Sequence, residues 1–331
     1  MLLFKIKGIL KIFLACILGK GIYTYRIFES DSKSSLEENF YSLEERNKFS
    51  IVMQGPYLYE DQFTFNTLLL YRKHFPHAVI IFSTTSELSR QEIKSLSDNG
   101  VYYIYNESPK HPGISNINYQ IVTTSSGLVK AKELGAKYVL KTRSDQRISH
   151  SGLEDYLINL MDCFPLTGDY PKQLGRLVGC SLNTLKLRPY GVSDMFLFGY
   201  LEDMIAYWCV PLEERKNVDV ALPDGCTWRE YAANEICEIR FCANYLRFIG
   251  RKLDFSIEGS MECMAEHFVI IDQDALRLIW PKYSLDQDTY KQFGNFPEIS
   301  FNDWLLVYMK SHKLNFNESA LDSPITKEVK V

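Results

Sequence analysis

Four short apolar runs, each separated from the next by a segment of helical character, constrain the fold of this chain most strongly. The runs are predicted to be strands, at Ser50–Met53, Ala78–Phe82, Val101–Tyr105 and Tyr138–Lys141. The segments between them are predicted to be helices, at Phe63–His74, Glu87–Asn99 and Asn118–Leu134. Nearly continuous apolar strands that alternate with helices predict an α/β fold, in which helices cover both faces of a mostly parallel sheet. Its βαβ crossovers are expected to be right-handed.

The alternation becomes less regular after residue 150. Further helices are predicted at Leu153–Asp162, at Leu201–Trp208 and at Trp228–Ile249, the last with a break near Asn234. Further strands are predicted at Arg176–Cys180 and Ser193–Gly199. Residues 50–310 show neither an internal repeat nor a strong boundary, so we expect them to form one domain, a size that 331 residues allow. Residues 311–331 are polar and are expected to form a loosely attached tail.

The composition excludes several classes of function. A net charge of -4 and a pI near 5.9 argue against a general nucleic-acid-binding protein. None of the eight cysteines forms a C-x-x-C pair, and no Cys/His grouping has zinc-ligand spacing, which favours a reducing, cytoplasmic compartment. The chain contains no Walker P-loop, no G-x-G-x-x-G and no G-x-S-x-G motif. Oligomeric state has no signal in the sequence.

The amino terminus, residues 1–21, has the pattern of an amphipathic cationic helix. Apolar residues recur at helical spacing among four lysines, and no acidic residue precedes Glu29. The longest run without charge, Ile12–Gly19, is much shorter than the roughly 20 residues that span a bilayer. We therefore expect this helix to lie on the inner-membrane surface, with residues 22–49 as a linker. The alternatives are a signal peptide and a helix that packs on the protein's own body.

The junction at residues 138–150 contains the clearest candidate site. The apolar residues Tyr138–Leu140 lead into a polar cluster around Asp145. A charged loop after a strand lies at the carboxyl edge of a sheet, where open α/β folds bind ligands. Asp145 can bind a divalent cation, and Lys141 and Arg143 can contact phosphate oxygens, a combination that suits a nucleotide diphosphate. A surface loop with a salt bridge is the alternative interpretation.

Several short stretches, taken in order, resemble the WavE-type lipopolysaccharide-synthesis family, over about residues 50–260. The matching stretches are Ile51–Pro56, Tyr71–Pro76, Ile80–Thr84, Asn116–Gln120, Ser126–Leu128, Tyr138–Asp145 and Val192–Gly199. The resemblance implies a GT-A-like nucleotide-sugar fold. It also implies a glycosyltransferase of bacterial surface polysaccharides, whose partners are a nucleotide-sugar donor and a saccharide or glycolipid acceptor.

A GT-A-like fold places the end of the first strand near the donor's base and ribose, and residues at the ends of the second and fourth strands and at the start of the helix over Asn118–Leu134 complete the set of expected donor-binding residues. They are Gln54, Gly55, Pro56, Ser83, Thr84, Asn116, Asn118, Gln120, Lys141, Arg143, Ser144 and Asp145. Most GT-A enzymes hold a metal with an Asp-x-Asp pair, but here Arg143 stands in place of the first Asp. We expect Mg2+ or Mn2+ to be held weakly by Asp145, while Lys141 and Arg143 help to neutralise the diphosphate. Metal-independent transfer is the alternative.

Sugar transfer with inversion requires one general base, and two carboxylates are the main candidates. Asp194 lies in an aromatic-rich segment, and Glu235 lies near the start of a predicted helix. Structural roles at a strand-edge turn or a helix terminus are the alternatives. Further candidates for the base are Glu230, Glu238 and Asp224. A second hypothesis, favoured by the missing first Asp, is a non-catalytic binding or assembly protein on the same scaffold.

Overall fold

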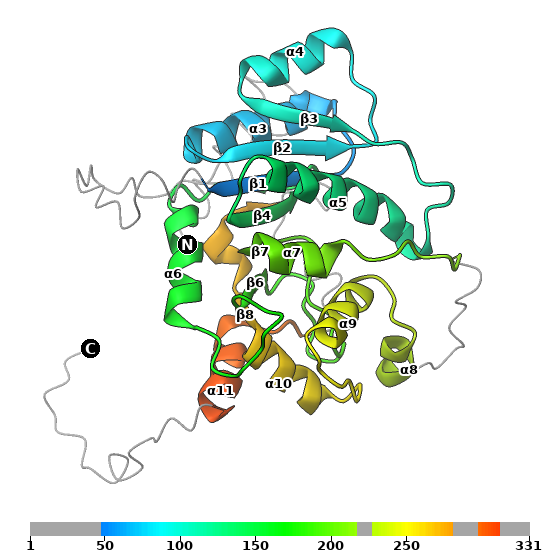
Figure 1. Ribbon diagram of the computed structural model, residues 1–331, viewed down its shortest axis with the longest axis vertical. Helices are drawn as coiled ribbons and strands as arrows, with labels where there is room; N and C mark the ends of the chain where they lie inside the picture. Colours follow the sequence, from blue (N-terminus) through cyan, green and yellow to red (C-terminus); the bar gives the residue numbers. More distant parts are fainter. Residues whose placement is uncertain (1–47, 217–226, 281–296, 312–331) are drawn as a thin grey trace, which may run out of the picture.

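The computed structural model describes residues 48–216, 227–280 and 297–311, and a seven-stranded sheet forms their centre (Figure 1). The strand order is β3-β2-β1-β4-β7-β6-β8. The strands are β1 Phe49–Gln54, β2 Val79–Thr84, β3 Val101–Tyr105, β4 Tyr138–Arg143, β6 Leu177–Cys180, β7 Leu197–Tyr200 and β8 Phe268–Ile271. Two further strands, β5 Arg147–Ile148 and β9 Leu278–Ile279, form a separate antiparallel pair.

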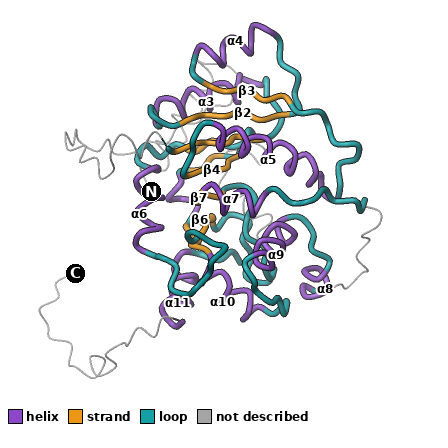
Figure 2. Tube along the Cα trace, viewed as in Figure 1, coloured by secondary structure: helices purple, strands orange, loops and turns teal. Residues whose placement is uncertain are grey.

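Helices surround this sheet, as Figure 2 shows. Their bounds are α3 Phe63–His74, α4 Arg90–Asp98, α5 Ile117–Glu133, α6 Leu153–Cys163, α7 Leu201–Trp208, α8 Trp228–Ala233, α9 Glu238–Phe248, α10 Ile257–His267 and α11 Phe301–Ser311. Helix α5 packs on β1, β2 and α7, and α7 packs on α9. At the β8 end of the sheet, α6 packs on β6, and α10 and α11 pack on β8. The expected α/β class, with a mostly parallel sheet flanked by helices, is confirmed.

Strand β7 is the exception to the parallel arrangement. It runs antiparallel to both of its neighbours, β4 and β6, whereas the other pairs in the sheet are parallel. The chain therefore enters β7 at the edge where the parallel strands end. In Figure 1 the arrowheads of β2 and β3 point toward this edge, which we call the carboxyl edge. The opposite edge is called the amino edge.

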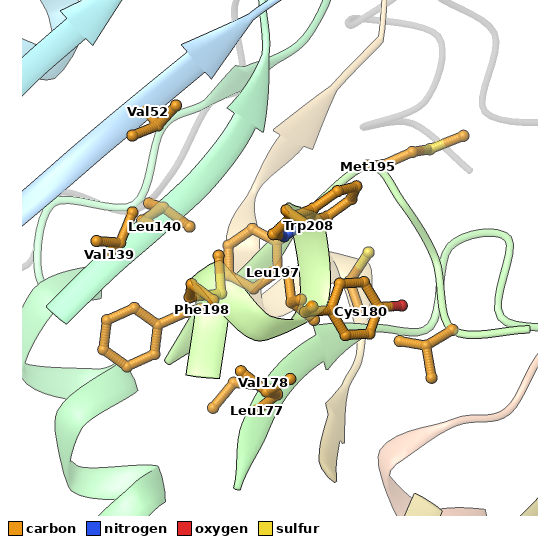
Figure 3. Packing of buried hydrophobic residues seen from close by; sticks show 14 of the residues in the cluster. Val52, Val139, Leu140, Leu177, Val178, Cys180, Met195, Leu197, Phe198 and Trp208 are labelled. Atoms are coloured by element: carbon orange, nitrogen blue, oxygen red, sulfur yellow. The ribbon is translucent and has the colours of Figure 1, made fainter. Parts of the chain in front are cut away.

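The core follows from the apolar strands that the sequence contains. Every residue of β1 and β8 is buried, which explains why these strands show no polar–apolar alternation. Figure 3 shows the part of the core around β4, β6 and β7, where Trp208 lies near Leu197. Helix α5 approaches the sheet closely because Gly127 has no side chain: a Cβ there would lie 2.4 Å from Val52 Cγ1.

The predicted elements of the first half agree with the structure more closely than those of the second half. Residues 193–196 were predicted to belong to a strand but form a bend and an irregular connection before β7. The predicted helix over Trp228–Ile249 is two helices, α8 and α9, separated near Asn234 as expected. Elements α10, β8 and α11 were not predicted.

The expected amino-terminal helix (1–21), nearly all of the linker (22–49), Asp224 and the tail after residue 311 lie outside the described residues. Within the described ranges, no helix combines the length and the apolar character that crossing a bilayer requires.

Candidate functional site

The candidate site lies where the order of the strands reverses. The chain passes from β1 outward to β2 and β3 and then returns to the other side of β1 as β4. Ligands of open α/β folds bind at such a switch point, outside the carboxyl ends of the strands. Gln54 at the end of β1 lies directly beside Arg143 at the end of β4. Because β7 is antiparallel, the segment that carries Asp194 reaches the same edge.

Arg143 and Asp145 form a tight ion pair at this edge. The Arg143 Nε donates to Asp145 Oδ1 at 2.9 Å, and its Nη2 donates to Oδ2 at 3.0 Å. The indole nitrogen of Trp280 also donates to Asp145 Oδ2, at 3.1 Å. Burial alone would raise the pKa of Asp145, but the hydrogen bonds from Arg143 hold it below its ordinary value. Burial alone would lower the pKa of Arg143, but Asp145 and Asp194 raise it, so the guanidinium stays charged.

Asp194 is the second carboxylate of the site. Its Oδ2 lies 3.7 Å from Arg143 Nη1, and both side chains keep a small exposed fraction, 15% for Asp194 and 25% for Arg143. Its backbone carbonyl accepts hydrogen bonds from the ammonium group of Lys141 and from Gln120 Nε2, the latter at 3.3 Å. The backbone of Asp194 is therefore fixed from two sides, while its carboxylate faces a positive charge across a wider gap.

Lys141 lies beneath the site rather than on its surface. Its side chain is fully buried, and its Nζ lies 4.3 Å from the centre of the Trp208 ring. Burial lowers the pKa of Lys141 to about 7, although Asp194 opposes part of this shift. Because its ammonium group is buried and donates to the Asp194 carbonyl, we expect Lys141 to support the Asp194 segment rather than to contact a ligand.

A buried ion pair lies behind Asp194. Glu238, the first residue of α9, accepts a hydrogen bond from Asn183 Nδ2 at 2.6 Å and lies 3.4 Å from Arg188 Nη1. Burial raises the pKa of Glu238, the Arg188 charge opposes that effect, and the Asp194 charge adds to it. The site therefore contains Asp145, Asp194 and Glu238 together with Lys141, Arg143 and Arg188, so its formal charges balance.

The backbone around this cluster is strained. Ser115 and Asn116 before α5, Asn183 after β6, and Glu235 and Cys237 before α9 all have φ between 49° and 64°. Non-glycine residues rarely adopt this conformation, and such strain gathers at functional sites.

Glu235 lies apart from the cluster. Its carboxylate forms an ion pair with both terminal nitrogens of Arg247, in the last turn of α9. Glu238 lies three residues further along the chain, and its carboxylate contacts the site residues Asn183 and Arg188. It therefore has the position within the site that was expected for Glu235. Glu235 and Cys237, both with positive φ, lie between α8 and α9, so the chain does not continue as one helix past these carboxylates.

The residues at the end of β1 differ in exposure, since some pack in the core and others reach the surface. Gln54 is buried, and its Oε1 accepts a hydrogen bond from Thr123 at 3.1 Å. Gly55 has φ +127°, and a Cβ there would lie 2.4 Å from Ser144 Oγ. Ser144 is fully buried, and its backbone N–H donates to the Gln54 carbonyl at 2.9 Å. Pro56 is exposed. Gly55 therefore allows β1 and the Arg143–Asp145 segment to approach closely.

The polar residues at the end of β2 are buried and stabilise a turn. Ser83 Oγ accepts a hydrogen bond from Asn106 Nδ2 at 2.9 Å, and Thr84 Oγ1 accepts one from the Ser86 backbone at 2.9 Å. Neither Ser83 nor Thr84 has any exposed surface, so their hydroxyls lie below the surface that a ribose would contact.

Three expected donor-binding residues at the start of α5 have different environments. Asn116 is exposed, whereas the buried amide of Asn118 exchanges two hydrogen bonds with the Glu213 backbone, at 2.8 and 2.7 Å. Gln120 is half-buried and reaches Asp194, as described above. Of the three, Gln120 is the one that forms a hydrogen bond with a residue of the site.

The donor set does not fit a divalent cation. Mg2+ and Mn2+ require several oxygen ligands, and no group of three His, Cys, Asp or Glu side chains suited to a metal occurs in the described part of the chain. Both oxygens of Asp145 already accept hydrogen bonds, and a guanidinium charge lies against them.

His267 lies at the amino edge, where it precedes β8, and it is a core residue. It is fully buried, and its Nδ1 lies 2.7 Å from Gln173 Oε1. Sequence reasoning did not identify the site residues Asn183, Arg188, Trp208 and Trp280. No local pattern marks them, because their contacts join separate parts of the chain. Trp280, for example, is 135 residues from its partner Asp145.

Comparison with known proteins agrees with this architecture. No curated protein matches the chain. The sequence model of one family, described as WavE lipopolysaccharide synthesis, matches residues 49–322, a span that starts at β1 and includes every residue of the site. That match covers well over half of the 331 residues and agrees with the resemblance noted in the sequence. The chain therefore belongs to the WavE lipopolysaccharide synthesis family.

Proposed function

We propose that this protein is a glycosyltransferase that moves a sugar from a nucleotide-diphosphate donor to a lipopolysaccharide or capsular polysaccharide acceptor. Three observations support the proposal. The family is described by lipopolysaccharide synthesis. The fold has a polar edge at a topological switch point. At that edge, a partly exposed carboxylate and a permanently charged guanidinium lie side by side.

The pair of Asp194 and Arg143 is the observation that carries the proposal. In an inverting displacement, the acceptor hydroxyl oxygen forms a bond to the anomeric carbon while the bond from that carbon to the diphosphate breaks. Asp194 accepts the hydroxyl proton as general base. Arg143 stabilises the negative charge that the departing nucleoside diphosphate acquires. Atoms and charges balance with donor and acceptor as the only reactants.

The place of action in this proposal is the cytoplasmic face of the inner membrane. Nucleotide sugars are charged and water-soluble, whereas lipopolysaccharide precursors carry lipid. The cationic amphipathic pattern of residues 1–21 suits attachment to an anionic membrane surface. Removal of these residues is expected to shift the protein from liposome-bound to unbound in a flotation assay, and retained binding would contradict the attachment.

The proposal is tested first by ligand binding. UDP-, GDP- and dTDP-sugars would be compared with CMP-sugars, which have a single phosphate, by thermal shift. We expect stabilisation by at least one nucleotide-diphosphate sugar and none by CMP-sugars. A ligand at one hundred times its dissociation constant stabilises a protein by about 2.7 kcal/mol. The donor that binds would then be tested for transfer of labelled sugar to lipopolysaccharide precursors.

A non-catalytic binding or assembly protein is the second candidate. Asp145 is paired with Arg143 and Glu238 with Arg188, so the site does not offer two unpaired carboxylates. The two proposals differ in one measurement. A binding protein retains the labelled donor unchanged, whereas a transferase releases the nucleoside diphosphate in the presence of an acceptor. Donor binding without any release, for every acceptor fraction of the cell envelope, would favour the second candidate.

A further inference from the structure

The Arg143–Asp145 pair carries an inference that rests on the proposed function and concerns how the donor is held. We propose that Asp145 positions Arg143 instead of ligating a metal, and that the Arg143 guanidinium binds the donor's diphosphate without a divalent cation.

The environment of the Asp145 carboxylate supports this assignment. An ionised carboxylate offers about four lone-pair positions, and three of them here accept N–H groups, two from Arg143 and one from Trp280. A divalent cation at Asp145 would have to displace these donors and lie against a guanidinium of the same sign. The carboxylate is therefore already neutralised, and its geometry fixes the plane of the guanidinium.

The guanidinium keeps donors for a ligand. Of its five N–H groups, two are directed to Asp145, one from Nε and one from Nη2. The remaining groups belong to Nη1 and to the second N–H of Nη2, and Nη1 is 3.7 Å from Asp194, beyond hydrogen-bond distance. The side chain is 25% exposed. One edge of Arg143 is thus held by the protein, and the other can donate two parallel hydrogen bonds to phosphate oxygens.

Trp280 fixes the arrangement further. The centre of its ring lies 5.7 Å from Arg143 Cζ, while its indole nitrogen donates to Asp145. One side chain therefore contacts both members of the pair, which limits rotation of the guanidinium. A preorganised charge stabilises a departing anion better than a mobile one, because no reorganisation is needed during the reaction.

The first experiment measures cation binding with no nucleotide present. Mn2+ would be added to the full-length protein, and the free ion would be followed by electron paramagnetic resonance. We expect the signal of free Mn2+ to persist in the wild-type protein, and we expect D145N not to change it. Stoichiometric Mn2+ binding that is lost in D145N would overturn the inference and would leave the proposed transferase activity intact.

The second experiment measures UDP, GDP and dTDP binding by calorimetry, in EDTA and in Mn2+. For the nucleotide that binds most tightly, we expect the dissociation constants measured in EDTA and in Mn2+ to agree within about threefold. R143K is expected to weaken binding at least tenfold, because lysine lacks the planar, bidentate geometry. D145N is expected to weaken it about tenfold, and Mn2+ is expected not to restore it.

Two further variants make the result interpretable. W280F removes one donor to Asp145 while it keeps an aromatic ring, and we expect about threefold weaker binding even if D145N folds poorly. D98N is the matched control, since it removes the charge from the exposed Lys94–Asp98 pair of helix α4, whose nitrogen and oxygen are 2.7 Å apart. Binding that requires Mn2+ in the wild-type protein would overturn the inference alone. No binding of any nucleotide in either condition would overturn it together with the proposed function.

Discussion

The two edges of the sheet both bury charged or titratable side chains, but the partners of those side chains differ. At the amino edge, the Asp203 carboxylate accepts hydrogen bonds from the backbone N–H groups of Leu174 and Gly175, each at 3.0 Å to Oδ2. Burial raises the pKa of Asp203 to about 6, although these bonds oppose the shift. At the carboxyl edge, Asp145, Asp194 and Arg143 face one another and keep part of their surface.

This difference distinguishes the structural role of Asp203 from the ligand-binding role that we propose for the carboxyl edge. A carboxylate that accepts backbone N–H groups, as Asp203 does, fixes a loop. At the carboxyl edge, Arg143 keeps N–H groups that Asp145 does not occupy, so it can bind a ligand without losing its partner. Four substitutions, D194N, D203A, K141M and H267N, test that distinction.

The largest effect is expected for D194N. If Asp194 is the base, loss of its charge should lower the turnover of sugar transfer by about 100-fold or more, because general bases contribute on the order of 100- to 10,000-fold. The melting temperature should change little. E235Q is the control, since Glu235 pairs with Arg247 instead of joining the site. Equal loss of turnover in both variants would remove the distinction between the two carboxylates.

D203A tests the amino edge and should show the opposite pattern. The substitution leaves the backbone N–H groups of Leu174 and Gly175 without their acceptor. A buried donor that loses its partner costs about 1–3 kcal/mol; the Gly175 N–H is buried, whereas the Leu174 N–H is partly buried. Chemical denaturation should show this loss of unfolding free energy, while donor affinity stays within about twofold of wild type. A large loss of affinity without a loss of stability would show that the amino edge belongs to the site.

K141M tests the support beneath Asp194. Lys141 is surrounded by Asp194, Arg143, Asp145 and Cys180, and its pKa is lowered from 10.5 to about 7, chiefly by burial. The native state then binds fewer protons than the unfolded chain between these values, so wild-type stability should fall as the pH falls from about 10.5 to 7. The fall should be absent in K141M when denaturant midpoints are compared across this range.

The same variant should lower turnover about tenfold and leave donor affinity nearly unchanged, because the Asp194 carbonyl loses one of its two donors. K137M is the control, since Lys137 lies over the Tyr138 and Tyr200 rings at the other end of β4. If K141M weakens donor binding and K137M does not, Lys141 contacts the donor after all.

The smallest effect is expected for H267N. Burial lowers the pKa of His267 to about 3, helped by the charges of Arg251 and Arg176. The unfolded chain takes up this proton near pH 6.5, so wild-type stability should fall as the pH falls from about 6.5 to 3. The asparagine keeps a donor for Gln173 but does not titrate, so the difference in stability between variant and wild type should shrink as the pH falls. A constant difference would contradict a buried neutral histidine.

The sequence predicted the first half of the sheet well because the signals there are local. Strands β1 to β4 are continuous apolar runs that end at polar residues, and the edge that holds Arg143 and Asp145 follows from that pattern. Strand β8 has four residues, and its pairing with β6 joins residues about ninety positions apart, so it gives no comparable local signal.

The composition of the site was predicted in part. The sequence placed Arg143, Asp145 and Asp194 among its candidates, and the antiparallel direction of β7 is what brings them together. It could not distinguish Glu235 from Glu238, because their different partners, Arg247 for Glu235 and Arg188 for Glu238, depend on how the chain folds around α8 and α9. It also could not show that Lys141 is buried, because lysine after an apolar strand is usually a surface residue.

A substitution at Gly127 is expected to affect the carboxyl edge of the sheet from a distance. Val52 lies on a rigid strand, so an alanine at position 127 would act as a wedge that tilts α5 away from the sheet. Gln120 is seven residues closer to the amino end of that helix, a lever arm of about 10 Å. A single methyl group in the middle of the helix would therefore weaken the hydrogen bond of Gln120 to the Asp194 backbone, although its own contacts would be with Val52 and Ser83.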